Sequence, residues 1–222
     1  MCGRFSLAAD MEQLQALFHF VFPEPLSPRF NIAPSQAVLT VVEENGMRIG
    51  KMMRWGLVPA WANDPKIGWK MINARGETVD EKASFRQALK RRRCLILADG
   101  FYEWKKEGTN KIPYRFTLRN GEPFAFAGLW EKWDKQGTAL YTCTIITTEA
   151  NELVSPIHER MPVILPPEQH EAWLDAKLED TDYVKSLLKP YAAAKMSMYE
   201  VASIVNSPKN DVRACLESIH GQ

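Results

Sequence analysis

Apolar residues recur at helical spacing near the start of the chain. Met11, Leu14 and Phe18 fall on one face of residues 8–20. This spacing predicts an amphipathic helix, which the prolines that follow it should end. Further helices are expected at residues 81–92, 167–176, 182–188 and 211–218.

Short apolar runs occupy the middle of the chain and predict strands. The expected strands are residues 37–42, 47–55, 94–98, 101–105, 114–118, 123–130, 140–147 and 196–202. A turn at Glu44-Asn45-Gly46 should join the first two strands, because Asn-Gly favours tight hairpins. Residues 59–69 are expected to form a loop. The central strands follow one another through Gly- and Asn-containing turns, which indicates an antiparallel or barrel-like arrangement.

The length and composition favour one domain over residues 1–222. The chain has 222 residues, of which 45% are hydrophobic, enough for a substantial core. No apolar run reaches the roughly 20 residues that span a bilayer, and the N-terminus lacks a secretory signal pattern. We therefore expect a cytoplasmic protein that does not bind membranes.

Charge and cysteine spacing exclude several classes of function. The net charge of +1 excludes a polybasic DNA coat, so any binding of an anion must be local. The four cysteines form no paired C-x-x-C spacing, and no metal site or cofactor is expected. Cys94 and Cys143 lie in apolar runs typical of core strands.

The chain begins Met1-Cys2-Gly3-Arg4, and removal of Met1 would leave a free amine and a thiol on adjacent carbons of Cys2. An α-amine titrates near pH 7.7–8.0 and a thiol near 8.5, so some of each is in its reactive form near neutrality. Such a 1,2-aminothiol can capture an aldehyde first as an imine and then as a five-membered thiazolidine. The alternative is a trimmed terminus with an inert thiol.

Two titratable residues lie in settings that suit proton transfer. His158 follows Ser155-Pro156 in a loop before an apolar run, where an imidazole can exchange protons near neutral pH. Glu103 lies among Phe101, Tyr102 and Trp104, which should raise its pKa. The alternatives are a structural histidine and an outward-facing glutamate.

Two further segments could present groups to a ligand. Asn73 and Arg75 lie in Ile72-Asn73-Ala74-Arg75-Gly76-Glu77, where Arg75 could bind a phosphate in bidentate fashion. A turn with a surface salt bridge is the alternative. Trp61 is expected to be exposed and able to stack an unpaired base, whereas Trp55 is expected in the core.

These motifs in this order resemble the SOS-response-associated peptidase family, whose members shield abasic sites in single-stranded DNA. The matching segments, which span nearly the whole chain, are Cys2-Gly3-Arg4-Phe5, Phe30-Asn31-Ile32-Ala33-Pro34, Trp55-Gly56-Leu57, Asn73-Ala74-Arg75-Gly76-Glu77, Asp99-Gly100-Phe101-Tyr102-Glu103-Trp104, His158-Glu159-Arg160-Met161-Pro162 and Val205-Asn206-Ser207. The resemblance implies a single-domain α+β fold built on a bent, mostly antiparallel sheet with a barrel-like core and peripheral helices. It also implies that DNA crosses a positively charged face.

The resemblance also implies roles for individual residues. Cys2 would be the nucleophile, Asn73 would orient the terminus, Glu103 would serve in acid-base steps, and His158 would contact the opened sugar. The expected DNA-binding residues are Gly3, Arg4, Asn31, Pro34, Trp61, Arg75 and Arg160, of which the arginines match phosphate-contacting positions. The expected partner is single-stranded DNA with an abasic site, bound by a monomer. The expected activity is lyase-like, and removal of Met1, by the chain itself or by another enzyme, is the only peptide cleavage it requires.

Two other classes of function remain open at this stage. An N-terminal-nucleophile amidotransferase would use a terminal cysteine to attack glutamine, although Arg4-Phe5 here departs from the Cys-Gly-Ile start of those enzymes. A non-covalent reader of modified or single-stranded DNA would use the tryptophans and arginines, with Cys2 as a bystander.

Overall fold

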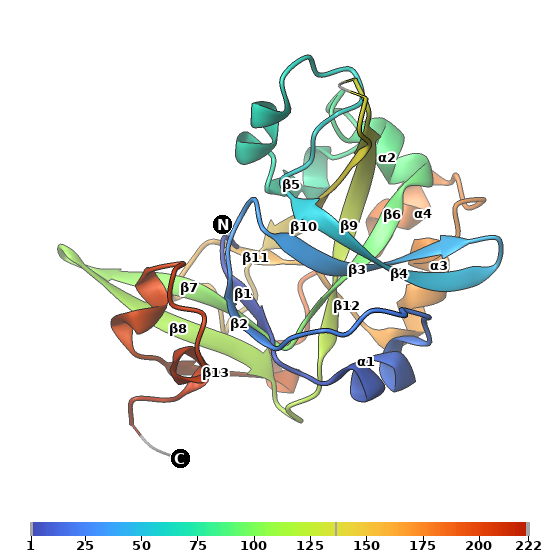
Figure 1. The fold of residues 1–222 in the computed structure, drawn as a ribbon. Helices are drawn as coiled ribbons and strands as arrows, with labels where there is room; N and C mark the ends of the chain where they lie inside the picture. The colour runs from blue at the N-terminus through green and yellow to red at the C-terminus, as the bar shows by residue number, and fades with distance from the viewer. Residues whose placement is uncertain (1, 136, 221–222) are drawn as a thin grey trace.

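The computed structural model describes residues 2–135 and 137–220, and it forms two sheets with short helices at their edges (Figure 1). The first sheet has the strand order β13-β8-β7-β1-β2. Its strands are β1 (Phe5–Leu7), β2 (Arg29–Ile32), β7 (Gly100–Glu107), β8 (Asn110–Leu118) and β13 (Met196–Glu200). All its pairings within the described residues are antiparallel.

The second sheet has the strand order β11-β10-β4-β3-β6-β9-β12, and β5 pairs with β10 beside this path. Its strands are β3 (Ala37–Glu44), β4 (Met47–Trp55), β5 (Asn73–Arg75), β6 (Arg93–Ala98), β9 (Phe124–Trp133), β10 (Leu140–Glu149), β11 (Arg160–Pro162) and β12 (Ile164–Leu165). Strands β4 and β5 both run parallel to β10, and the other pairings are antiparallel.

The second sheet curls strongly. Strand β9 pairs with β6 on one edge and with β10 on the other, so the strands β10, β4, β3, β6 and β9 follow one another around a ring. The link between β10 and β4 consists of only two residue pairs, Thr142 with Arg54 and Cys143 with Trp55. The described strands therefore form a barrel-like core without a regular closed barrel. The predicted α+β class with mostly antiparallel strands is confirmed.

The α-helices are short and lie around the sheets (Figure 1). They are α1 (Met11–Phe18), α2 (Arg86–Arg91), α3 (His170–Leu174) and α4 (Thr181–Ser186). Six 3-10 helices are present among the described residues: Pro65–Lys70, Gly76–Thr78, Pro167–Gln169, Ala193–Lys195, Ser203–Asn206 and Arg213–Leu216. No helix in the described part of the chain has the length and apolar character needed to cross a membrane.

Most of the predicted strands form at or near their expected positions. Strand β6 is buried along its whole length, as its continuous apolar run predicted. The turn between β3 and β4 also forms as expected, with Asn45 at φ 53° and Gly46 at φ 78°. Positive φ at both positions is the geometry that an Asn-Gly hairpin turn provides. Cys94, Cys143 and Trp55 are all buried in the core, as predicted.

The helix boundaries differ from the predicted ones. Helix α1 begins after Asp10, whose side chain accepts a hydrogen bond from the Gln13 amide at 2.8 Å, and it ends at His19 in the left-handed region, before the prolines. Residues 81–85 form turns, and α2 starts only at Arg86, after Phe85, which provides no side-chain cap. The expected loop at 59–69 contains a 3-10 helix, and the expected helix at 211–218 is a single 3-10 turn.

Candidate functional site

The segment that follows Met1 is held beside β7, although Met1 itself lies outside the described residues. Phe5 pairs with Phe101, and the Tyr102 amide donates a hydrogen bond to the Arg4 carbonyl at 3.0 Å. Cys2 is fully buried, in contrast to an open, flexible terminus. The pairing brings Cys2 to the part of β7 that contains Glu103.

A carboxylate at the start of β7 fixes this segment in place. Asp99 accepts hydrogen bonds from the Ser6 hydroxyl at 2.6 Å and from the backbone amides of Ala8 and Ala9. Arg115, which is 7% exposed, donates to the same carboxylate at 2.9 Å. A charged, half-buried acceptor with several donors is strongly oriented, so β1 has little freedom to slide along β7.

Asn73 connects the second sheet to Cys2. It is the first residue of β5, and its side-chain amide donates a hydrogen bond to the Cys2 carbonyl at 2.8 Å. Its Oδ1 atom is buried and has no hydrogen-bond partner among the described residues. Asn73 is therefore in contact with Cys2, the residue that it would orient according to the family resemblance.

Burial controls the acid-base properties of Cys2 and Glu103. It raises the pKa of the Cys2 thiol well above its ordinary value, the negative charge of Glu103 raises it further, and a hydrogen bond from the Arg4 backbone lowers it. Burial likewise raises the pKa of Glu103 to about 7. The raised pKa of Glu103 is confirmed. The expected share of thiolate near neutrality concerns the terminus left after Met1 removal; in the chain that still has Met1, burial favours the neutral thiol, which then needs a base as it reacts.

His158 ends the turn that precedes β11. Its Nδ1 atom accepts a hydrogen bond from the Arg160 amide at 2.9 Å, so the neutral ring has its proton on Nε2. Burial lowers the pKa of His158; the backbone hydrogen bond with Arg160 and the charge of Glu159 oppose this, the positive charge of Lys106 adds slightly to it, and the net shift is downward. The imidazole is therefore mostly neutral near pH 7 and can donate its Nε2 proton.

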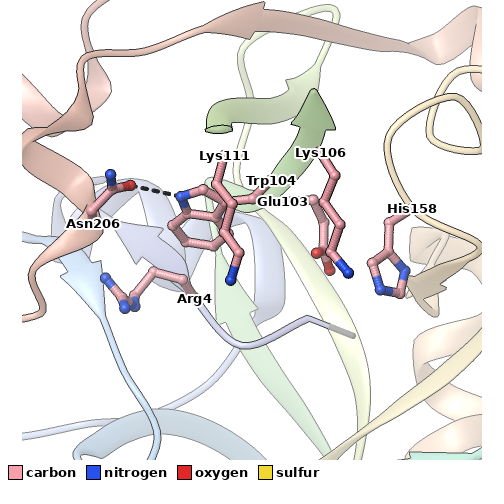
Figure 2. Close-up of a pocket in the computed structure, with 7 residues that line it drawn as sticks. All are labelled: Arg4, Glu103, Trp104, Lys106, Lys111, His158 and Asn206. Atoms are coloured by element: carbon pink, nitrogen blue, oxygen red, sulfur yellow. Dashed lines mark hydrogen bonds between the residues drawn. The ribbon is translucent and has the colours of Figure 1, made fainter. Parts of the chain in front are cut away.

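A pocket of about 500 Å³ brings several of these side chains together. It is lined by Arg4, Glu103, Trp104, Lys106, Lys111, His158 and Asn206. Figure 2 shows Arg4 and Asn206 toward one end of the pocket and His158 at the other, on the side of Glu103. The pocket therefore has a cationic and aromatic end and an acid-base end.

The cationic end is built around Arg4. Its guanidinium lies 5.6 Å from the ring centre of Trp104, and its Nη1 donates to Asn31 Oδ1 at 2.8 Å and to the Val205 carbonyl at 2.7 Å. The Trp104 indole donates to Asn206 Oδ1 at 2.7 Å (Figure 2). These contacts fix the orientation of the Arg4 guanidinium and therefore the side from which it can bind an anion.

Asn31 is fully buried, so its amide supports the site from within. Its Oδ1 accepts from Arg4, and its Nδ2 donates to the carbonyls of Val205, Ser207 and Asn210, at 3.1, 3.0 and 2.7 Å. These bonds attach the C-terminal segment to β2. The chain end, red in Figure 1, thereby packs beside β7 and β8 and supplies one wall of the pocket.

The other predicted DNA-binding residues lie in different settings. Gly3 and Pro34 are half-buried and Arg75 is exposed. Arg160 is occupied within the protein: its guanidinium pairs with Glu77 through bonds of 2.6 and 2.9 Å and donates to the Thr147 carbonyl at 2.7 Å. The salt bridge considered as the alternative for this loop is therefore present, between Glu77 and Arg160.

Exposed tryptophans occur near the 3-10 helix of residues 65–70. Trp61 is 56% exposed, as the sequence predicted, and Trp69 is 67% exposed. Lys135 fixes the backbone here, since its ammonium donates to the Trp61 carbonyl at 2.8 Å. Flat aromatic faces in solvent suit stacking on unpaired bases.

Sequence reasoning missed several residues that line the pocket or its surroundings. Trp104 and Asn206 lay within quoted motifs but received no role, and Lys106, Lys111 and Trp69 were not considered. The lysines could have been found from the β7–β8 hairpin register, because a two-residue turn at Gly108-Thr109 places them opposite each other. Asn206 could not have been found in this way, because its position at the pocket depends on the path of the C-terminal segment.

Comparison with known proteins gives one family. A family model described as SOS response associated peptidase matches residues 1–208. The abasic site processing protein YoqW of Bacillus subtilis is 51% identical over 224 residues, which cover 98% of this chain and 100% of the relative. The abasic site processing protein HMCES of Gallus gallus is 38% identical, over 79% of this chain and 59% of the relative.

Solved structures share the fold. A crystal structure of a protein from Bacteroides thetaiotaomicron superposes with a TM-score of 0.89 at 28% identity, covering 98% of this chain and 99% of the other. One from Bordetella bronchiseptica gives a TM-score of 0.79 at 26% identity, covering 90% of this chain and 100% of the other. The arrangement of both sheets is therefore found in proteins with quite different sequences.

Proposed function

Because this chain belongs to the SOS response associated peptidase family, we propose that it binds abasic sites in single-stranded DNA and forms a covalent crosslink to them through Cys2 after Met1 has been removed. Relatives from Bacillus subtilis and Gallus gallus are named abasic site processing proteins, which supports the choice of substrate. The crosslink would shield the lesion from other chemistry.

The observation that supports this proposal best is the convergence of groups from distant parts of the chain on Cys2. Asn73 of β5 donates a hydrogen bond to the Cys2 carbonyl, and the charge of Glu103 in β7 acts on the Cys2 thiol. Glu103 also shares a pocket with His158, which comes from the turn before β11. An aldehyde in this pocket would meet two acid-base groups, and one of them, Glu103, lies close enough to the buried Cys2 thiol for its charge to act on that thiol.

The substrate must first open its sugar ring. An abasic deoxyribose is mostly a closed hemiacetal, in which the C1′–O4′ bond has to break. The 1′-hydroxyl then gives up its proton as the C1′ aldehyde forms, and O4′ accepts a proton to become a hydroxyl. His158, with a proton on Nε2, is suited to protonate O4′, and the carboxylate form of Glu103 is suited to accept the hydroxyl proton.

The capture step loses one water molecule in total. The Cys2 amine adds to C1′ to give a hemiaminal, whose hydroxyl leaves as water when protonated Glu103 donates its proton. The protonated imine that results is attacked at the same carbon by the Cys2 sulfur, and the thiol proton passes to the Glu103 carboxylate, which leaves a neutral thiazolidine nitrogen. Glu103 thus ends the capture step protonated, as it began that step, and the proton that it took up in ring opening returns through solvent to His158, which gave one to O4′; this cycle suits a carboxyl whose pKa is about 7.

Removal of Met1 is the peptide bond cleavage that this function requires, since an acylated Cys2 nitrogen cannot form the imine. The carbonyl of Cys2, held by Asn73, remains in place after that cleavage. The chemistry toward DNA is lyase-like in that a carbon–oxygen bond of the sugar is broken without hydrolysis. No general protease activity is proposed.

The test is a denaturing gel of the protein with a single-stranded oligonucleotide that contains one abasic site. The wild-type protein should give a band of protein joined to DNA. Cys2→Ala should give none, and Cys2→Ser should give at most a reducible imine that borohydride traps. Cys94→Ala, which removes another fully buried thiol, is the matched control and should form the adduct normally.

Each outcome separates the candidate functions. A stable adduct in Cys2→Ala or Cys2→Ser would contradict the thiazolidine. Binding of the oligonucleotide by the wild-type protein without any adduct would favour a non-covalent reader. Glutaminase activity that depends on Cys2, without an adduct, would favour the amidotransferase.

A further inference from the structure

The β7–β8 hairpin places two lysines side by side at the pocket. Lys106 and Lys111 are directly opposite in the antiparallel register, and both line the pocket (Figure 2). Both are exposed at the projecting end of the hairpin (Figure 1). Residues directly opposite in an antiparallel pair have Cβ atoms about 4.5–5.5 Å apart.

This pair is unfavourable for the hairpin by itself. Like charges directly opposite each other destabilise an antiparallel pair. In the part of the chain that the structure describes, neither lysine has an ion pair with a carboxylate, whereas the neighbouring Lys105 pairs with Glu107 at 2.6 Å. An anion between the two ammonium groups would remove their repulsion.

The position of the pair indicates which anion it would hold. Arg4 and Trp104 lie toward one end of the pocket, and the positive charge of Lys106 acts on His158 at the other. A nucleotide within a DNA strand has a phosphodiester on each side of its sugar. In Figure 2 the cationic side chains follow one another from Arg4 through Lys111 to Lys106, which lies next to Glu103 on the side of His158, so they match successive phosphates along a strand that runs through the pocket.

We infer that Lys106 and Lys111 together form a second phosphate-binding site, which holds one of the two phosphodiesters that flank the reacting nucleotide while Arg4 contacts the other. This inference rests on the proposed function, because it takes the reacting sugar to lie beside Glu103 and His158. It assigns the lysine pair to substrate binding alone, with no part in bond making.

The first experiment measures equilibrium binding of a single-stranded oligonucleotide with a tetrahydrofuran abasic analogue, which has no aldehyde. The double variant Lys106→Ala/Lys111→Ala should bind roughly 5- to 20-fold more weakly than the wild type, the effect of losing a contact between charged groups. Its log–log salt slope should fall by about 0.7, the value for one phosphate on a single strand. Lys105→Ala, which removes an adjacent charge, should change neither quantity, and thermal unfolding should show both variants to be folded, with the double variant at least as stable as the wild type because it has lost the lysine repulsion.

The second experiment identifies the phosphate. A neutral methylphosphonate replaces one phosphodiester at a time next to the analogue. At one of the two flanking linkages, this replacement should weaken the wild type but have little further effect on the lysine double variant. Equal sensitivity of both proteins at every linkage would overturn the inference, as would a loss of affinity in Lys105→Ala as large as that in the double variant.

The two proposals fail in different ways. A wild-type protein that binds the analogue but never forms an adduct with an abasic site contradicts the covalent function, and the lysine experiment can still be interpreted. A wild-type protein that forms the adduct, together with a lysine double variant of unchanged affinity and salt slope, contradicts the second phosphate site alone.

Discussion

The side-chain amide of Asn73 donates a hydrogen bond of 2.8 Å to the carbonyl oxygen of Cys2, a residue 71 positions earlier in the chain. Asn73 begins β5 in the second sheet, whereas Cys2 leads into β1 of the first. This contact therefore ties the two sheets together at the candidate nucleophile. The Oδ1 of Asn73 is buried and has no hydrogen-bond partner among the described residues, so it can still accept one.

Asn73→Ala should slow formation of the DNA adduct by roughly 10- to 100-fold, because the Cys2 amine would lose its orientation toward the aldehyde carbon. Stability should fall by only about 1 kcal/mol, the net value of one hydrogen bond. Single-turnover rates on denaturing gels and thermal unfolding measure the two effects. Asn120→Ala, at an exposed asparagine, is the control and should match the wild type; an unchanged rate in Asn73→Ala would show that Cys2 needs no such support.

Glu103 should make the stability of the protein depend on pH. Burial raises its pKa from 4.5 to about 7, so the folded protein binds a proton that the unfolded chain has released between these values. The free energy of unfolding should therefore decrease as pH rises from about 4.5 to 7, by up to about 3 kcal/mol for this group. Glu103→Gln should remove that decrease, so the variant protein should be more stable than the wild type above pH 7.

Denaturant unfolding of both proteins from pH 4 to 8 measures this difference. Glu152→Gln, at an exposed glutamate, should follow the wild-type curve. If the curves of Glu103→Gln and the wild type run parallel across the range, the carboxyl is not held in its protonated form by burial.

The structure also explains which parts of the site the sequence could predict. Glu103 and His158 were found because each lies in a distinctive local context, aromatic neighbours in one case and a proline-bounded loop in the other. Cys2, Asn31, Asn73 and the residues around them lie on or beside strands of three or four residues. Such strands are too short for periodicity to detect, and they exist only because distant strands pair with them.

For the same reason, the local sequence could not show how individual polar residues are used. The expected contact of Asn31 with DNA took no account of its burial, which depends on the C-terminal segment that folds over it. The guanidinium of Arg160 donates a hydrogen bond to Glu77, a residue 83 positions away. The resemblance to a family located these residues, but their contacts could be assigned only from the folded chain.

Glu103 and His158 should affect different steps of adduct formation. His158→Ala should slow ring opening and should also slow transfer of the protein from labelled to competitor abasic DNA, because groups that assist closure assist reversal. Glu103→Gln should slow capture most, and the wild-type rate should fall above pH 7 as the donor carboxyl is lost. Single-turnover formation and competitor exchange between pH 5 and 9 separate the two. If His158→Ala changes neither rate at any pH, His158 has a structural role only.

Loss of Arg75 should change the salt dependence of DNA binding, whereas loss of Arg160 should change the stability of the protein. Arg75 is exposed, so Arg75→Ala should lower the log–log salt slope of binding by about 0.7 and leave stability within about 0.5 kcal/mol. The guanidinium of Arg160 is engaged by Glu77 and the Thr147 carbonyl, so Arg160→Ala should cost about 1–2 kcal/mol of stability and leave the slope unchanged. Salt titrations with the abasic analogue and denaturant unfolding measure both quantities, with the exposed Arg119→Ala as control. A reduced slope in Arg160→Ala at unchanged stability would mean that DNA displaces Glu77, and that Arg160 exchanges its internal partner for a phosphate on binding.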